Sequence, residues 1–152
     1  MKLGEALSKL KKEKSRLARL LQLRKENIYS EKRKKPKFDP KKLSKEIDAK
    51  VEEIRKLKIT IQKTNLATIV KGEDISLAEA IIKVNDLRGK IAHLSTLFEN
   101  KRDYLFREKD EKDKISQLDE LKIEDEIIKA EIEKVQLDNK IQIMNWTTSL
   151  HD

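Results

Sequence analysis

Cysteine is absent from this chain of 152 residues. Its absence excludes disulfide bridges, thiolate metal sites and cysteine nucleophiles. Aromatic residues are scarce too, since the chain has one Trp, two Tyr and three Phe, too few for the thick core of a globular enzyme. Three Gly and two Pro leave few points at which a helix must break. These shortages favour long helices over a compact globular fold.

Long apolar runs are also missing. The longest is Leu66–Val70 when its threonine is included, far short of the roughly 20 residues that span a bilayer. The first residues enter an amphipathic helix directly and lack the apolar region of a secretory signal. We therefore expect no transmembrane segment and a cytoplasmic location.

What the sequence does contain is charge and heptad-spaced aliphatic residues. Charged residues make up 42% of the chain and hydrophobic residues 37%. Aliphatic residues recur at steps of three and four, which places them along one stripe of a helix. In the first helix they are Leu3, Leu7, Leu10, Leu17, Leu21 and Ile28, interrupted by Lys14 and Arg24. This pattern is typical of coiled coils.

Capping signals divide the chain into about four helices. Asp39-Pro40 supplies an N-cap acceptor followed by proline at the first helical position, and Ser76 with Glu79 forms a capping box. We predict an all-α fold in which long antiparallel amphipathic helices form coiled-coil hairpins or a helical bundle, as a single domain of residues 1–152. The expected helices span residues 3–28, 40–70, 77–106 and 115–148, with a basic, proline-containing loop over 29–41.

The second and last helices carry seams of their own. The seam of the second is Leu43, Ile47, Ile54, Leu57 and Ile61, with Lys50 as the exception. The last helix has two stripes, Ile123, Ile127, Ala130, Leu137, Ile141 and Met144 in one and Leu121, Ile128, Ile132 and Val135 in the other. We interpret these stripes as lying side by side in one broad face. A face that wide usually contacts more than one partner helix, so the sequence predicts a homo-oligomer.

Charge is distributed unevenly along the chain. The formal net charge is +8, and Lys and Arg outnumber Asp and Glu more than twofold in residues 1–60, whereas acidic residues are in excess afterwards. One interpretation is a polyanion-binding surface, such as one for nucleic acid, centred on the basic loop. The other is a solvated helix face that neutralises the acidic last helix. The candidate polyanion contacts are Lys32, Arg33, Lys34, Lys35 and Lys37.

Two polar clusters interrupt the seams near helix ends. They consist of Thr64, Asn65 and Thr68 in the second helix and Asn145, Trp146 and Thr147 in the last. In a four-helix arrangement these helix ends can meet, so that amides and hydroxyls pair while the indole covers them. One interpretation is a register-fixing polar layer at helix ends, and the other is a small binding pocket.

Catalytic and metal-binding constellations do not emerge from the sequence. His93 and His151 each lack the partner at i+4 that a helical zinc site needs. No Gly-rich phosphate loop is present, and Gly89 lies inside the third helix, where we expect close helix approach. We therefore expect a non-enzymatic protein without a metal or cofactor.

Four segments resemble a family of small bacterial helical proteins often labelled septicolysin. They are MKLGEAL at 1–7, IQKTNLAT at 61–68, LAEA at 77–80 and NWTTSL at 145–150. The resemblance spans nearly the whole chain and implies a helical fold and a bacterial origin. The label implies a cytolytic activity but carries over no active residues, and this chain has Asn85-Asp86 where many members have Arg-Asp.

The leading functional hypothesis is a self-associating coiled-coil scaffold or interaction protein. The alternative is an electrostatic nucleic-acid binder that acts through the basic N-terminal half. A further alternative is a septicolysin-like cytolytic or pore-forming protein, although narrow apolar stripes on densely charged helices are poor material for membrane insertion.

Overall fold

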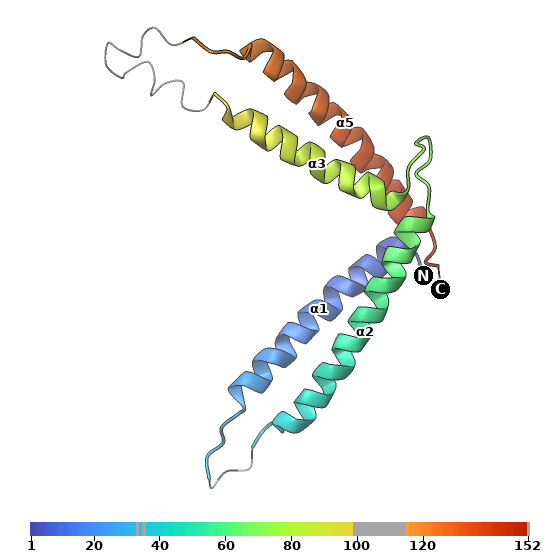
Figure 1. The fold of residues 1–152 in the computed structure, drawn as a ribbon. Helices are drawn as coiled ribbons and strands as arrows, with labels where there is room; N and C mark the ends of the chain where they lie inside the picture. Colours follow the sequence, from blue (N-terminus) through green and yellow to red (C-terminus); the bar gives the residue numbers. More distant parts are fainter. Residues whose placement is uncertain (33, 35, 99–114, 152) are drawn as a thin grey trace, which may run out of the picture. The chain divides into compact units, whose positions relative to one another are not determined.

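The computed structural model describes the chain except for residues 33, 35, 99–114 and 152. The described part forms four α-helices, and the predicted all-α class is confirmed (Figure 1). The chain divides into two compact units, the first comprising Met1–Thr68 with Met144–Asp152 and the second Ile69–Ile143. The helices are α1 (Leu3–Glu26), α2 (Pro40–Ala67), α3 (Leu77–Thr96) and α5 (Glu120–Thr147).

In the first unit, α1 and α2 form an antiparallel hairpin (Figure 1). The predicted seam of α2 is confirmed, since Leu43, Ile47, Ile54, Leu57 and Ile61 are all buried. The predicted seam of α1 is partly wrong. Leu7, Leu21 and Ile28 are 38%, 41% and 59% exposed, and although Leu3 of the predicted seam is buried, so are Ala6 and Glu13, which lie outside it. The buried stripe of α1 is therefore rotated away from the leucine heptad, toward the face that carries Glu13.

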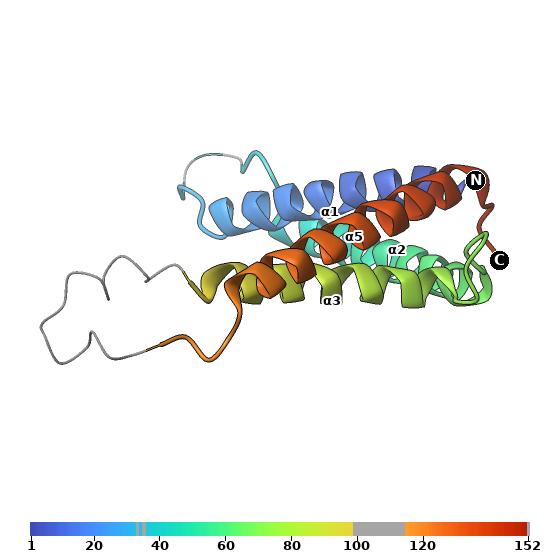
Figure 2. The same cartoon turned by 90° about the horizontal axis from the view of Figure 1, so that it is seen from above.

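The second unit is an antiparallel hairpin of α3 and α5 (Figure 2). Two ion pairs join the helices, with Lys83 Nζ 2.7 Å from Glu133 and Lys90 Nζ 3.3 Å from Glu126. The residue numbers rise along α3 and fall along α5, as expected for antiparallel helices. Each ion pair is exposed and of the kind that contributes little to stability. Burial of apolar side chains between the helices contributes more to stability than these ion pairs do. The apolar core consists of Val70, Leu77, Ala80, Val84, Ala130, Leu137 and Ile141.

Local hydrogen bonds and backbone conformation set the end of α1 and both ends of α2. Asn27 Nδ2 donates to the Leu23 carbonyl at 2.8 Å, which satisfies a terminal carbonyl, and α1 ends at Glu26 rather than at residue 28. The N-cap predicted at Asp39 is present, since its carboxylate accepts from the Lys41 amide at 2.9 Å. At its other end α2 stops at Ala67 rather than at residue 70, because Thr68 is already extended.

The remaining bounds also differ from expectation. The hydroxyls of Ser95 and Thr96 donate hydrogen bonds to backbone carbonyls of the preceding turn. These bonds compete with the backbone hydrogen bonds that would continue the helix. Accordingly α3 ends at Thr96, and the rest of the helix expected to reach 106 lies largely outside the described residues. Asp119 Oδ1 accepts from the Leu121 amide at 3.1 Å and caps α5, which begins at Glu120 rather than at residue 115.

The tight connection that precedes α3 belongs to the second unit, which begins at Ile69. Val70 donates its amide to the Ile75 carbonyl at 3.0 Å, and Gly72 takes a φ of 79°, a left-handed conformation that favours glycine. The predicted capping box then starts α3, with the Ser76 amide donating to Glu79 at 2.7 Å. Gly89, by contrast, has open space around it, so the close approach expected there is wrong.

The two apolar stripes of α5 lie on opposite faces of the helix rather than side by side. At about 100° per residue, the stripe through Ala130 and the stripe through Ile132 point in nearly opposite directions. The Ala130 stripe packs in the core of the second unit, whereas the other stripe is half exposed or more. None of the helices in the described part of the chain is long and apolar enough to cross a bilayer.

Candidate functional site

The C-terminal segment and the N-terminus are held together in the first unit by backbone hydrogen bonds. The Leu3 amide donates to the Thr148 carbonyl and the Leu150 amide to the Met1 carbonyl, both at 3.0 Å. Lys2 Nζ adds a hydrogen bond of 2.8 Å to the Thr147 carbonyl. The two ends of the sequence therefore form one structural element, which the structure places against the end of α2.

The polar cluster of α2 lies beside this element. Thr64 is fully buried, and its hydroxyl donates to the Thr60 carbonyl at 2.9 Å and accepts from the His151 amide at 3.0 Å. Asn65 Oδ1 and Thr68 Oγ1 are buried and have no hydrogen-bond partner in the described part of the chain. The contact between the end of α2 and the C-terminal segment thus runs through Thr64 and the backbone of His151.

The second polar cluster contacts the start of α1. The indole of Trp146 is 59% exposed and lies over Gly4, where an added Cβ would sit 3.0 Å from the ring. Asn145 is half-buried, and its carbonyl oxygen lies 3.1 Å from the same Cβ position. A residue without a side chain at position 4 is what allows the indole and this carbonyl to approach α1.

The basic loop is described in part. Lys32, Lys34 and Lys37 are exposed, whereas Arg33 and Lys35 lie outside the described residues. Lys34 Nζ lies 2.8 Å from Glu31, and Lys37 Nζ lies 5.8 Å from the centroid of the Phe38 ring. Lys34 and Lys37 therefore each contact a neighbouring residue of the loop.

A buried ion pair that sequence reasoning missed lies between α1 and α2. Glu13 is only 3% exposed, and its carboxylate accepts from Lys50 Nζ at 2.7 Å and from Arg16 Nη1 at 2.8 Å. Lys50 Nζ also donates to Glu53 at 2.6 Å. The available signal was Lys50 itself, the one charged residue in an otherwise aliphatic seam, because a cation at a core position requires a carboxylate opposite.

These contacts shift the pKa values of the participating groups. The hydrogen bond from Lys50 lowers the pKa of Glu13, with Arg16 adding to the effect, and burial opposes it. The same lysine lowers the pKa of Glu53. Hydrogen bonds to both carboxylates raise the pKa of Lys50. The cluster is therefore fully ionised at neutral pH.

We expect the stability of the protein to fall as the pH drops below the ordinary glutamate pKa of 4.5. A carboxyl whose folded pKa is lowered contributes stability above its unfolded pKa, and this contribution is lost as the pH falls through the folded value. The Lys50 contribution is constant in this range, because its pKa is raised from 10.5. Urea unfolding from about pH 6 to pH 3 measures the effect.

In Glu13→Gln this loss of stability with acid should be shallower than in the wild type, since one shifted carboxyl is gone. Glu46→Gln, which removes an exposed carboxyl of α2 outside the cluster, is the matched control and should keep the wild-type slope. Identical slopes for wild type and Glu13→Gln would contradict the ion pair.

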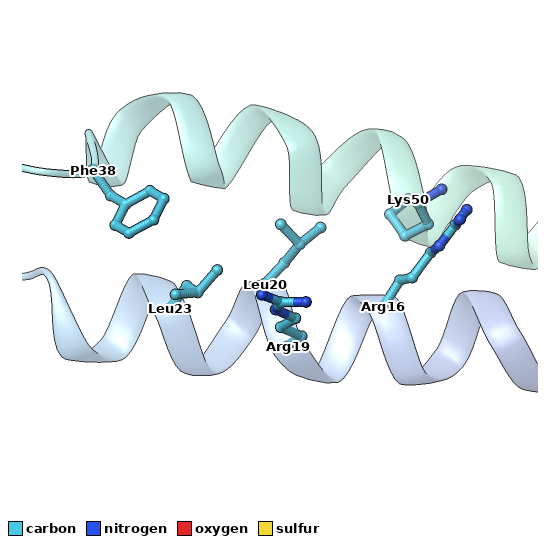
Figure 3. A pocket seen from close by; sticks show the side chains of 6 residues that line it. All are labelled: Arg16, Arg19, Leu20, Leu23, Phe38 and Lys50. Carbon is cyan, nitrogen blue, oxygen red and sulfur yellow. The ribbon is translucent and has the colours of Figure 1, made fainter.

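A cavity of about 320 Å³ lies next to this ion pair. Leu20 and Leu23 project from α1 toward α2, and Phe38 from the loop before α2 faces them (Figure 3). Arg16, Arg19 and Lys50 complete the lining. The described residues contain no group of three or more His, Asp or Glu side chains that could hold a metal ion.

The outer face of α5 carries a set of exposed aliphatic residues. Its members are spaced in heptads and are between 51% and 73% exposed: Leu121, Ile128, Ile132 and Val135. Single exposed aliphatic residues are ordinary, but aliphatic residues that recur at heptad spacing on a charged helix are typical of a coiled-coil interface.

Comparison with known proteins places the chain in a family. The crystal structure of a functionally unknown conserved protein from Corynebacterium diphtheriae is similar to it over 99% of both chains, with 26% identity and a TM-score of 0.83. No curated protein matches the chain. Nothing in these comparisons supports the septicolysin label. The model of a family of unknown function (DUF6847) matches residues 10–150, and the chain belongs to that family.

Proposed function

We propose that the protein is a non-enzymatic helical interaction protein that self-associates through the outer face of α5. The observation that carries this proposal is the exposed heptad stripe from Leu121 to Val135. Pairing two copies along it would remove these side chains from water, and burying one such side chain contributes about 1.5–3 kcal/mol. The face packed on α3 would stay as it is.

The charges beside the stripe favour a parallel pair. With Ile128 and Val135 at heptad position d, Glu124 and Glu131 fall at g, and Lys122 and Lys129 fall at e. In a parallel coiled coil g faces e of the partner, so Glu124 meets Lys129 of the partner subunit. In an antiparallel pair g faces g and e faces e, which would oppose like charges.

Two polar residues interrupt the stripe at heptad position a. Asn139 opposite its own copy favours a parallel, in-register dimer at some cost in stability. Asp125 opposite its own copy is unfavourable, because two like charges are brought together. We therefore expect a dimer of moderate affinity whose mass depends on concentration.

The expected mass by light scattering is twice 17.8 kDa at high protein concentration. A Val135→Cys variant tests the orientation, since the natural chain has no cysteine. In a parallel in-register pair the two introduced thiols lie within disulfide distance, so oxidation should link most of the protein as dimer. Ile59→Cys, at an exposed position of α2, should dimerise without becoming linked by a disulfide. A mass near 18 kDa at every concentration would contradict the proposal.

Binding of nucleic acid is the alternative, and the exposure of Lys32, Lys34 and Lys37 supports it. An affinity for an oligonucleotide that falls steeply with salt, and is reduced when these three lysines are replaced by glutamine, would favour it. Dimerisation through an apolar stripe should depend much less on salt. Release of dye from liposomes would instead favour a cytolytic activity.

A further inference from the structure

The cavity between α1 and α2 is lined almost entirely by apolar atoms. Leu20, Leu23 and Phe38 supply whole apolar side chains, and all three are half-buried. Arg16, Arg19 and Lys50 complete the lining chiefly with their aliphatic stems, and no acidic side chain takes part in it. Its volume of about 320 Å³ lies within the range of small-molecule sites, which are mostly apolar with a few placed polar groups.

The cations of the lining are not equally satisfied. Arg16 and Lys50 both donate to Glu13, and Lys50 also donates to Glu53. Arg19 makes no ion pair with any residue in the part of the chain that the structure describes. Arg19 also lines the cavity, so its guanidinium is a cation near an apolar cavity without a carboxylate partner among the described residues. The charge that would complete this arrangement is negative.

We propose that this cavity binds a small amphipathic anion, with a carboxylate or phosphate head on Arg19 and a short apolar chain or ring against Leu20, Leu23 and Phe38. A guanidinium offers paired N–H donors that match both kinds of oxyanion. Arg16 also lines the cavity, and its charge adds positive potential. The neighbouring Glu13 holds Lys50 and Arg16 in place, so the site is formed before the ligand arrives.

Sodium octanoate is the first probe, titrated into the full-length protein while the methyl and aromatic resonances of Leu20, Leu23 and Phe38 are followed by NMR. We expect saturable shifts of these resonances. Acetate has the head without the chain and 1-octanol the chain without the head, and each should bind at least tenfold more weakly. Octyl phosphate distinguishes the two kinds of head, because tighter binding than octanoate would assign a phosphate monoester.

Two variants separately remove the guanidinium that would bind the anionic head and the aromatic ring that would contact the apolar part of the ligand. Arg19→Gln should weaken octanoate binding by about tenfold or more, since a charge-assisted hydrogen bond is lost. Lys12→Gln removes the same charge from an exposed position of α1 outside the lining and should leave the affinity unchanged. Phe38→Ala should weaken octanoate and 1-octanol alike. Circular dichroism of each variant confirms that the helices are retained.

Three results would overturn the proposal. One is the absence of saturable shifts with either anionic probe, and another is equal weakening by Arg19→Gln and Lys12→Gln. The third is sedimentation of the protein with phosphatidylglycerol vesicles in an Arg19-dependent manner when neither free anion binds. That pattern would place the anion on a membrane surface rather than in the cavity.

Discussion

Replacement of Gly4 by valine is expected to lower the free energy of unfolding by about 1–3 kcal/mol, the usual cost of overfilling a packed site. A Cβ at this position would already sit 3.0 Å from the Trp146 ring and 3.1 Å from the Asn145 carbonyl, and valine adds two more carbons. The indole must then leave α1. Trp146 is the chain's single tryptophan, so its fluorescence reports the displacement directly, and urea unfolding measures the stability.

Gly89→Val is the matched control for this prediction. No atom lies within 4 Å of an added Cβ at Gly89, and the position is inside α3. Valine has a somewhat higher helix propensity than glycine, so this variant should be as stable as the wild type or slightly more stable. Wild-type stability and tryptophan emission in Gly4→Val would show that the C-terminal segment does not pack on α1.

Replacement of Ile128 and Ile132 by glutamate is expected to weaken self-association by more than about a hundredfold, if the dimer pairs through the outer face of α5. Four buried isoleucines are lost from the pair, and like charges are brought together at its centre. Both residues are more than half exposed, at 53% and 54%, so the helical content of the chain should be retained. Light scattering across a concentration series measures the change.

The control for this prediction places two glutamates on another exposed apolar surface. Val51 and Ile59 of α2 are 47% and 49% exposed, and their replacement should leave the dimer intact. Asp125→Leu should have the opposite effect and tighten the dimer about tenfold or more, because an apolar residue replaces the one charge in the stripe. A dimer unaffected by either α5 variant would have to form elsewhere.

Helix formation was predictable because its determinants are local. Proline at the first helical position after Asp39, and the capping box of Ser76 with Glu79, are readable from the sequence, and both caps are present in the structure. Helix ends were less accessible. They depend on side chains such as Asn27 and Thr96, whose hydrogen bonds to nearby carbonyls compete with helical ones only weakly.

The partners of the polar and charged residues were harder to predict. Heptad spacing shows that an apolar stripe exists, but a rotation of part of a turn changes which residues are covered. In α1 the ion pair between Glu13 and Lys50 marks the covered face, so that Leu7 and Leu21 remain partly exposed. The cavity beside this pair needs Phe38 as well as α1, and residues so far apart in sequence give no joint signal.

The amino-acid sequence by itself determined that this protein is all-α, that the seam of α2 is buried and that α5 carries two apolar stripes. Each of these follows from residue type and spacing within one helix. Only the tertiary structure decided that one stripe of α5 is covered by α3, that Trp146 rests on Gly4 and that Glu13 is buried. Those features depend on which surfaces meet, and the periodicity of a single helix does not specify its partner.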